Sequence, residues 1–245
     1  MKHIKTEIKG AIARVYLNRP EVLNALNGEM VNELFLFFNE IMSNLDVKVI
    51  IVSGEGRAFC AGVDLKATTA EGFHSASVFM ETGLKLAELM QAMPQVVIAQ
   101  IHGYCFTGAL EFMLFFDLVY CDRETQFGDT HSKWSILPRW GLTQRLSRKV
   151  GLEKAKELSF RAMRVKGTEA EKIGLVNQAF EVDLLDDEVN QIANDILQNS
   201  FEAIAKIKQL YNEGHQTTLK EGLRIEYEMD PKLNSTEEYL SKFKK

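Results

Sequence analysis

Two glycine-bearing segments have the residue types and spacing to stabilise a negatively charged intermediate. The first, GRAFCAGVDLK, spans residues 56–66, and the second, IHGYCFTGALE, spans residues 101–111. Each follows an apolar, β-branched run, at residues 49–52 and 96–99, which predicts a buried strand. Glycine lets a ligand approach the backbone closely, so two such loops could direct two N–H groups at one oxygen. This arrangement stabilises an enolate or a tetrahedral intermediate.

The second segment ends in an acidic residue, Glu111, among apolar neighbours. A carboxylate in a partly buried, apolar site is suited to acid–base catalysis. The same carboxylate could instead stabilise the first turn of a helix. Gly62 and Gly108 likewise could do no more than permit tight turns. The local sequence leaves these alternatives open.

Together with other segments, the two loops resemble the crotonase superfamily, also called the enoyl-CoA hydratase/isomerase family. The further segments are NRPEVLNAL at 18–26, CDRETQFG at 121–128, GLTQRL at 141–146 and GTEAEKIGLVNQAF at 167–180. They follow one order over roughly three quarters of the chain, which is far more than a single motif match.

The resemblance implies an α/β fold, a crotonase-like spiral of β-β-α units with a helical C-terminal region that builds homotrimers or dimers of trimers. It implies that the backbone N–H groups of Val63 and Gly108 form an oxyanion hole for a CoA thioester. It implies that Glu111 holds and activates water. We count Asp64 with the substrate- and CoA-binding positions and expect it to brace the first loop by hydrogen bonding. The positions implied for coenzyme A are Asn24, Ala25, Leu26, Cys60, Ala61 and Lys66, with basic residues Lys242, Lys244 and Lys245.

The chain departs from the hydratase pattern at two positions. Where those enzymes have a second glutamate, this chain has His131. A histidine titrates near neutral pH and could pair with Glu111, or Asp129 could replace the glutamate after a small loop shift. The Pro-Gly pair of hydratases is replaced here by Pro138 and Arg139, whose guanidinium could bind a substrate carboxylate or point outward.

We therefore expect an acyl-CoA enzyme that stabilises a thioester enolate, with hydration of an enoyl-CoA as the first expectation. Isomerisation of a double bond, or decarboxylation of a malonyl-type thioester, uses the same enolate without two glutamates and stays open. An acyl-CoA-binding protein with little catalysis also stays open. The departures at His131 and Arg139 favour that alternative, whereas the presence of Glu111 opposes it.

Composition narrows the class of protein. Among 245 residues, 46% are hydrophobic and the formal net charge is −5, which gives no global attraction to nucleic acid. We expect no membrane partner, because no apolar run approaches membrane-spanning length, and the charged N-terminal segment favours a cytoplasmic protein. The three cysteines have no paired spacing and predict buried, reduced thiols. No metal-ligand motif, GxGxxG or GxSxG is present, so we expect no metal and no cofactor besides the CoA thioester substrate.

The elements that must position these residues follow from the apolar pattern. Strands are predicted at 12–17, 49–53, 96–101 and 118–121, and helices at 30–45, 83–93 and 184–197. Residues 66–77 are predicted to be a loop or short helix beside the site. Capping boxes are predicted at Thr168 with Glu171 and at Ser235 with Glu238. We divide the chain into a β/α core with the acyl-CoA site at 1–190 and a helical region at 191–245.

Overall fold

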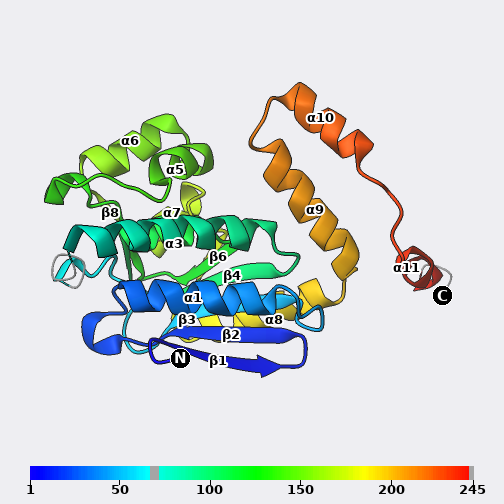
Figure 1. Ribbon diagram of the computed structural model, residues 1–245, viewed down its shortest axis with the longest axis horizontal. Helices are drawn as coiled ribbons and strands as arrows, with labels where there is room; N and C mark the ends of the chain where they lie inside the picture. Colours follow the sequence, from blue (N-terminus) through cyan, green and yellow to red (C-terminus); the bar gives the residue numbers. More distant parts are fainter. Residues whose placement is uncertain (67–71, 243–245) are drawn as a thin grey trace.

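The computed structural model describes residues 1–66 and 72–242 and has the α/β architecture that the sequence predicts (Figure 1). Within these residues, six strands form the main sheet, in the order β1-β2-β3-β4-β6-β9. The first pair is antiparallel and the other pairs are parallel. The strands are β1 (Ile4–Lys9), β2 (Ile12–Leu17), β3 (Val49–Gly54), β4 (Val96–Ile101), β6 (Leu118–Asp122) and β9 (Gln178–Phe180).

A second sheet of three short strands lies beyond the carboxyl ends of β3 and β4. It contains β5 (Tyr104–Phe106), β7 (Gln126–Gly128) and β8 (Arg164–Lys166). An isolated parallel bridge joins Cys60 to Cys105, so the first glycine loop pairs with the strand that leads into the second. This bridge brings together two loops that are about forty residues apart in the sequence.

Helices cover both faces of the main sheet because successive strand residues point to opposite sides. On one face, Ile50 and Val52 pack in a cluster with residues of α1 (Gly28–Ile41) and α3 (Gly72–Ala92). On the other face, Val49 and Ile51 pack with residues of α8 (Leu185–Leu197). The continuous apolar runs of β3 and β4 reflect burial on both faces.

The remaining helices are α4 (Gly108–Met113), α5 (Leu142–Val150), α6 (Leu152–Phe160), α7 (Gly167–Lys172), α9 (Phe201–Gly214), α10 (Leu219–Glu228) and α11 (Thr236–Ser241). Two single 3₁₀ turns, η1 (Pro20–Val22) and η2 (Ser132–Trp134), complete the described elements. In Figure 1, α10 and α11 lie away from the sheet, and α9 connects them to the core. The predicted boundary at residue 190 falls inside α8, whose Val189 and Ala193 pack on the sheet, and the division into 1–190 and 191–245 stays a prediction.

Two predicted helix limits are wrong. The helix expected at 30–45 ends at Ile41, and Leu45 lies exposed in the following turn, so its apolar character is not used for packing in the monomer. The helix expected at 83–93 begins at Gly72, which includes part of the stretch expected to be a loop or short helix. Residues 67–71 of that stretch lie outside the described residues.

Both predicted capping boxes are also wrong. Thr168 lies inside α7, and the side chain of Glu171 accepts a hydrogen bond from the backbone of Ala179. Ser235 precedes α11, but its hydroxyl bonds Ser200 and Glu202 and not the helix backbone. In both cases tertiary partners compete successfully for a side chain that could have capped its own helix.

The cysteine prediction is confirmed, since Cys60, Cys105 and Cys121 are free and buried. In the described part of the chain, no helix combines the length and the apolar character that crossing a membrane requires.

Candidate functional site

The first glycine loop is fixed by a short parallel bridge between Leu26 and Val63. Leu26 donates its N–H to Gly62 O at 2.8 Å and accepts from Asp64 N at 2.8 Å. In a parallel bridge, the residue between two such bonds directs its own N–H to the opposite side. The N–H of Val63 is therefore directed away from Leu26, and this loop geometry needs Gly62 at a φ of 115°.

The second loop brings Gly108 directly against Val63. A Cβ atom added to Gly108 would lie 2.6 Å from Val63 Cγ2 and 3.3 Å from Val63 N, so only glycine fits there. Within the described residues, neither the Val63 amide nor the Gly108 amide has a protein acceptor. The structure thus brings the two predicted N–H donors together at one place.

The turn before Gly108 is strained. Thr107 has a φ of 54° and a ψ of −110°, an uncommon conformation for a β-branched residue. Its N–H bonds Gly128 O at 2.9 Å, and its hydroxyl shares a hydrogen bond with the Thr130 hydroxyl. Strained residues of this kind persist where their surroundings hold them, and they concentrate at functional sites.

The Glu111 carboxylate is buried and divides its oxygens between different partners. Oε1 accepts the backbone N–H groups of Trp140, at 2.8 Å, and Leu142, at 3.3 Å. Oε2 lies 3.4 Å from Nε2 of His131. Glu111 lies in α4, three residues after Gly108, and side chains with that spacing share one face of a helix. The predicted pairing of Glu111 with His131 is therefore present in the geometry.

His131 is held between two carboxylates. Its Nδ1 lies 2.6 Å from Asp129 Oδ1, and its backbone N–H donates to the same oxygen at 3.1 Å. Burial alone would lower the pKa of His131, but the hydrogen bonds to Asp129 and then Glu111 outweigh burial and raise the pKa to about 9. Burial opposes ionisation of Asp129, but hydrogen bonds from His131 and Ser159 lower its pKa. At neutral pH the site therefore contains an imidazolium. Asp129 contacts the imidazole of His131 and is not among the residues that line the cavity described next.

Val63, Glu111 and His131 line one cavity of about 400 Å³. Its wall is apolar over most of its extent and includes the basic side chains of Lys133, Arg139 and Arg164. The lining residues include Ala61, Val63, Leu65, Met80, Thr107, Glu111, His131, Lys133, Trp134, Ile136, Leu137, Arg139 and Arg164. A cavity of this size with a few convergent polar groups is the usual form of a small-molecule site.

The positions predicted to bind the substrate or coenzyme A separate into lining and supporting residues. Ala61 and Arg139 line the cavity. Asn24 is fully buried, accepts from Arg19 N, and donates to the carbonyls of Glu55 and Ala58. Leu26 and Cys60 have no exposed surface, so only their backbone could contact a ligand. Lys66 lies on the surface after the first loop, Lys242 pairs with Glu238 on α11, and Lys244 and Lys245 lie outside the described residues.

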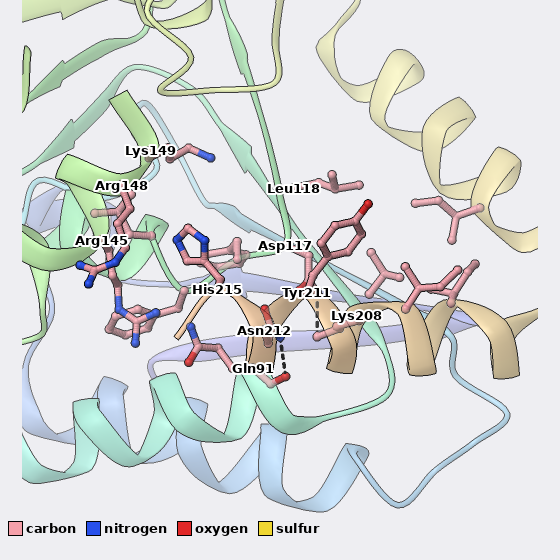
Figure 2. A pocket seen from close by; sticks show the side chains of 17 residues that line it. Gln91, Asp117, Leu118, Arg145, Arg148, Lys149, Lys208, Tyr211, Asn212 and His215 are labelled. Atoms are coloured by element: carbon pink, nitrogen blue, oxygen red, sulfur yellow. Dashed lines mark hydrogen bonds and ion pairs between the residues drawn. The ribbon is translucent and has the colours of Figure 1, made fainter. Parts of the chain in front are cut away.

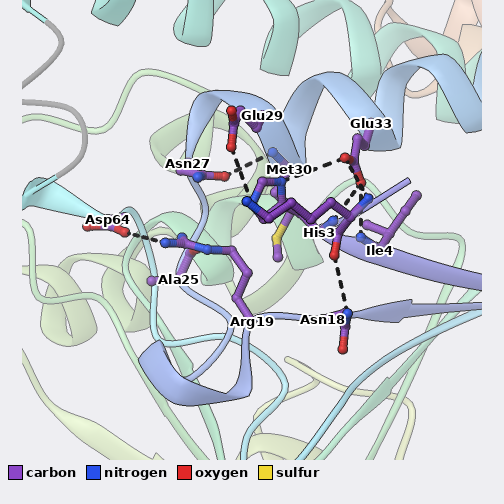
Figure 3. Close-up of polar contacts among 11 residues, drawn as sticks. His3, Ile4, Asn18, Arg19, Ala25, Asn27, Glu29, Met30, Glu33 and Asp64 are labelled. Atoms are coloured by element: carbon purple, nitrogen blue, oxygen red, sulfur yellow. Dashed lines mark hydrogen bonds and ion pairs between the residues drawn. The ribbon is translucent and has the colours of Figure 1, made fainter.

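Asp64 braces the first loop, as expected. Figure 3 shows its carboxylate facing the Arg19 guanidinium, and the two atoms Nη2 and Oδ2 are 3.0 Å apart. Arg19 also donates to the Ala25 carbonyl at 2.6 Å. The ion pair is largely shielded from solvent, with both side chains about 15% exposed, so it links the segment around residues 19–25 firmly to the glycine loop.

Sequence reasoning missed three residues of the site. Thr107 gave no signal, because a positive φ at a threonine cannot be recognised from its neighbours. Thr130 gave none either, because its contact with the Thr107 hydroxyl depends on the tertiary fold. The indole of Trp140 packs against Gly83 of α3 and the Phe79 ring. Its backbone amide nevertheless holds Glu111. The exposed Trp134 also lines the cavity.

A larger cavity, of about 610 Å³, lies between α9 and the core (Figure 2). It contains Lys208, whose ammonium pairs with the Asp117 carboxylate at 2.8 Å and donates to the carbonyls of Met90 and Gln95. None of the predicted site residues lines this cavity. The candidate active site is therefore the smaller one.

Comparison with known proteins agrees with this fold. The model of the family described as enoyl-CoA hydratase/isomerase matches residues 7–243. A probable peroxisomal enoyl-CoA hydratase 1 from Arabidopsis thaliana is 34% identical over 89% of this chain and 82% of that protein. A short-chain-enoyl-CoA hydratase from Clostridium acetobutylicum is 33% identical over 97% and 92%. The crystal structure of an enoyl-CoA hydratase from Bacillus anthracis superposes with a TM-score of 0.94 at 30% identity, covering 99% of this chain and 96% of that one.

The fold is thus that of a solved enoyl-CoA hydratase across almost its whole length. The chain belongs to the enoyl-CoA hydratase/isomerase family, the crotonase superfamily.

Proposed function

We propose that this protein adds water across the α,β double bond of an enoyl-CoA. The observation that carries the proposal is the position of Glu111 and His131, which lie 3.4 Å apart in the cavity that also contains Val63. A carboxylate that accepts a proton and an imidazolium that donates one are the two groups that hydration requires. Curated relatives with names such as short-chain-enoyl-CoA hydratase and crotonyl-CoA hydratase support the same activity.

The thioester carbonyl is proposed to lie between the amides of Val63 and Gly108. As water adds to the β-carbon, Glu111 takes one proton from it, and the electrons of the double bond move onto the thioester oxygen. The two N–H groups stabilise the resulting enolate, an interaction that strengthens as charge develops. His131 then donates the proton on Nε2 to the α-carbon.

This sequence leaves Glu111 protonated and His131 neutral. A proton passed from Glu111 Oε2 to His131 Nε2 restores both groups, and their 3.4 Å separation makes that transfer direct. The reaction consumes one water and one enoyl thioester and yields one 3-hydroxyacyl thioester. No external acid or base is needed between turnovers.

For the quaternary structure we propose the homotrimer or dimer of trimers expected from the sequence. The support is an uncovered apolar row on α10, formed by Leu219, Leu223 and Tyr227, which are 80%, 58% and 92% exposed. Spaced four residues apart, they share one helix face. A second copy of the chain would bury this face.

The test is direct assay with crotonyl-CoA. We expect loss of the conjugated enoyl thioester absorbance and a product heavier by one water. Movement of the double bond without a mass change would instead indicate isomerisation, and release of CO₂ from a malonyl-type thioester would indicate decarboxylation. Tight binding of several acyl-CoAs without turnover would indicate a carrier and contradict the proposal.

A further inference from the structure

Asp129 does not line the cavity, yet it makes the shortest contact to His131. Its Oδ1 accepts from both Nδ1 and the backbone N–H of His131, and the side chains of Asp129 and His131 are 3% and 7% exposed. We propose that Asp129 is a positioning residue that directs the Nε2–H bond of His131 at Glu111 and makes His131 enter the reaction as an acid. The inference rests on the proposed hydration only in the step in which His131 donates its proton to the α-carbon.

The hydrogen-bonding capacities of the three side chains determine which ring nitrogens of His131 carry a proton. An ionised carboxylate only accepts, so Nδ1 carries a hydrogen toward Asp129. If His131 were neutral, Nε2 would then present a lone pair to Glu111 Oε2, and two acceptors would face each other at 3.4 Å. When the ring takes up a second proton, on Nε2, this repulsion is replaced by an attraction. Two carboxylates on opposite sides of one imidazole therefore favour the doubly protonated ring.

Other charged groups near His131 oppose its protonation. Lys133 from its own segment, and Arg139 and Arg164 from neighbouring segments, line the same cavity. They are exposed to solvent, which screens their effect, whereas Asp129 and Glu111 are buried beside the ring. The buried carboxylates therefore dominate. A chain with a second glutamate at position 131 would not need Asp129 in this role.

The experiment follows the titration of His131 by NMR in protein labelled at the histidine ring, without substrate. We expect a wild-type pKa near 9, and in Asp129→Asn a value lower by at least about one unit, because asparagine keeps the shape but removes the charge. The kcat of Asp129→Asn should show its basic limb at lower pH, with a loss of at least about twofold near pH 8 and about fivefold near pH 9, almost no loss near pH 6 and little change in KM. Asp129→Glu should restore part of the shift.

Asp122→Asn is the matched control. Asp122 is also buried and accepts the backbone N–H groups of Glu124 and Thr125, but it does not contact His131. It should leave the His131 titration and the pH profile of kcat in place. A wild-type His131 that titrates near 6.5 would overturn the inference even if Asp129→Asn did not fold. An inactive enzyme with a raised His131 pKa would contradict the hydratase proposal and leave this inference standing.

A different observation concerns the substrate. Lys133, Arg139 and Arg164 line the cavity, and in the described part of the chain none of them has a carboxylate partner. Arg164 lies over the Phe106 ring at 4.9 Å, and Arg139 directly precedes Trp140, whose amide holds Glu111. The one acidic lining residue, Glu111, is already balanced by His131. The cavity therefore has an excess of positive charge close to its acid–base pair.

We infer that the preferred acyl group carries a carboxylate at its far end, which these cations bind. This inference rests on the proposed hydration, since it specifies the enoyl thioester. A plain short alkenoyl chain would leave the three cations without a counterion from the acyl group. A carboxylate would gain charge-assisted hydrogen bonds, bidentate ones from the arginines. The phosphates of CoA are the other possible source of negative charge, and the experiment must separate the two.

The test compares trans-glutaconyl-CoA with trans-2-pentenoyl-CoA, which have equal chain lengths and the same CoA. We expect wild type to prefer the diacid by at least about tenfold in kcat/KM, and Arg139→Gln to reduce that ratio by about tenfold. Arg148→Gln, at an arginine that lines the other cavity, should leave the ratio unchanged. An equal loss on both substrates would assign Arg139 to CoA and overturn the inference. Preference for pentenoyl-CoA would do the same while the hydratase proposal stood.

Discussion

The Glu111 carboxylate and the His131 imidazole face each other at 3.4 Å, each held on its far side by a different part of the chain. Backbone amides of residues 140 and 142 hold Glu111, and Asp129 holds His131. Neither group depends on the other for its orientation. Each can therefore exchange its proton during a reaction without losing its position.

Replacement of Glu111 by glutamine should abolish hydration while the fold is retained. Glutamine keeps an oxygen that can accept from the Trp140 and Leu142 amides, but it cannot take a proton from water. We expect kcat to fall by roughly a hundredfold or more. Turnover of crotonyl-CoA measures the change, and thermal unfolding provides the control for folding. Wild-type kcat in this variant would remove Glu111 from the mechanism.

Gly108→Ala tests the proposed oxyanion hole by a steric change that leaves the charges of the site unaltered. The new Cβ would lie 2.6 Å from Val63 Cγ2, which must move and carry its amide with it. Displacement of one such donor costs on the order of a hundredfold in kcat. Gly222→Ala on α10 is the control, because its Cβ would make only an ordinary 3.5 Å contact. If both variants keep full activity, the pair of amides has another role.

The stability of the protein should fall as the pH rises from 6.5 to about 9. The pKa of His131 is raised in the folded state, so its contribution is complete below its ordinary value of 6.5 and is lost as the pH passes about 9. The difference corresponds to about 3 kcal/mol of unfolding free energy. Urea unfolding at fixed protein concentration should show this decline in wild type and a much flatter profile in His131→Gln. Parallel profiles would mean that His131 is not protonated near neutral pH.

The apolar row on α10 should disappear into a subunit interface. Light scattering at micromolar concentration should give the mass of three or six chains. Leu223→Glu should shift the protein to smaller species, because a charge at the centre of the row opposes its burial. Leu45→Glu is a matched change at another exposed leucine and should leave the assembly intact. A wild-type monomer would contradict the proposed trimer.

Long apolar runs and glycine loops were sufficient to predict the core. The strands at 49–54 and 96–101 are buried on both faces. A strand buried on both faces needs apolar residues at successive positions, and this pattern can be recognised in the sequence. The strands β5, β7, β8 and β9 have three residues each and were missed. A three-residue strand is too short to establish a period, and it forms because its partners are already in place.

The site was predictable only in part, for a related reason. Glu111 and His131 could be named because their types carry chemistry and their positions match a family. Asp129 was considered as a replacement for the missing glutamate, whereas in the structure it contacts His131 and does not line the cavity. The Trp140 amide was missed because every residue except proline has a backbone N–H, so the residue type does not indicate this donor. Its position depends on packing across many residues.

The packing of Trp140 on α3 has a consequence for which sequences this protein can tolerate. A Cβ on Gly83 would lie 2.2 Å from the Trp140 indole. Alanine ordinarily favours a helix interior, but at this position it would displace the indole of the residue whose backbone amide binds Glu111. A substitution that should stabilise the helix, far from any reacting atom, would therefore change the orientation of the Glu111 carboxylate. The packing of Trp140 therefore requires glycine at position 83, although glycine has a lower helix propensity than alanine.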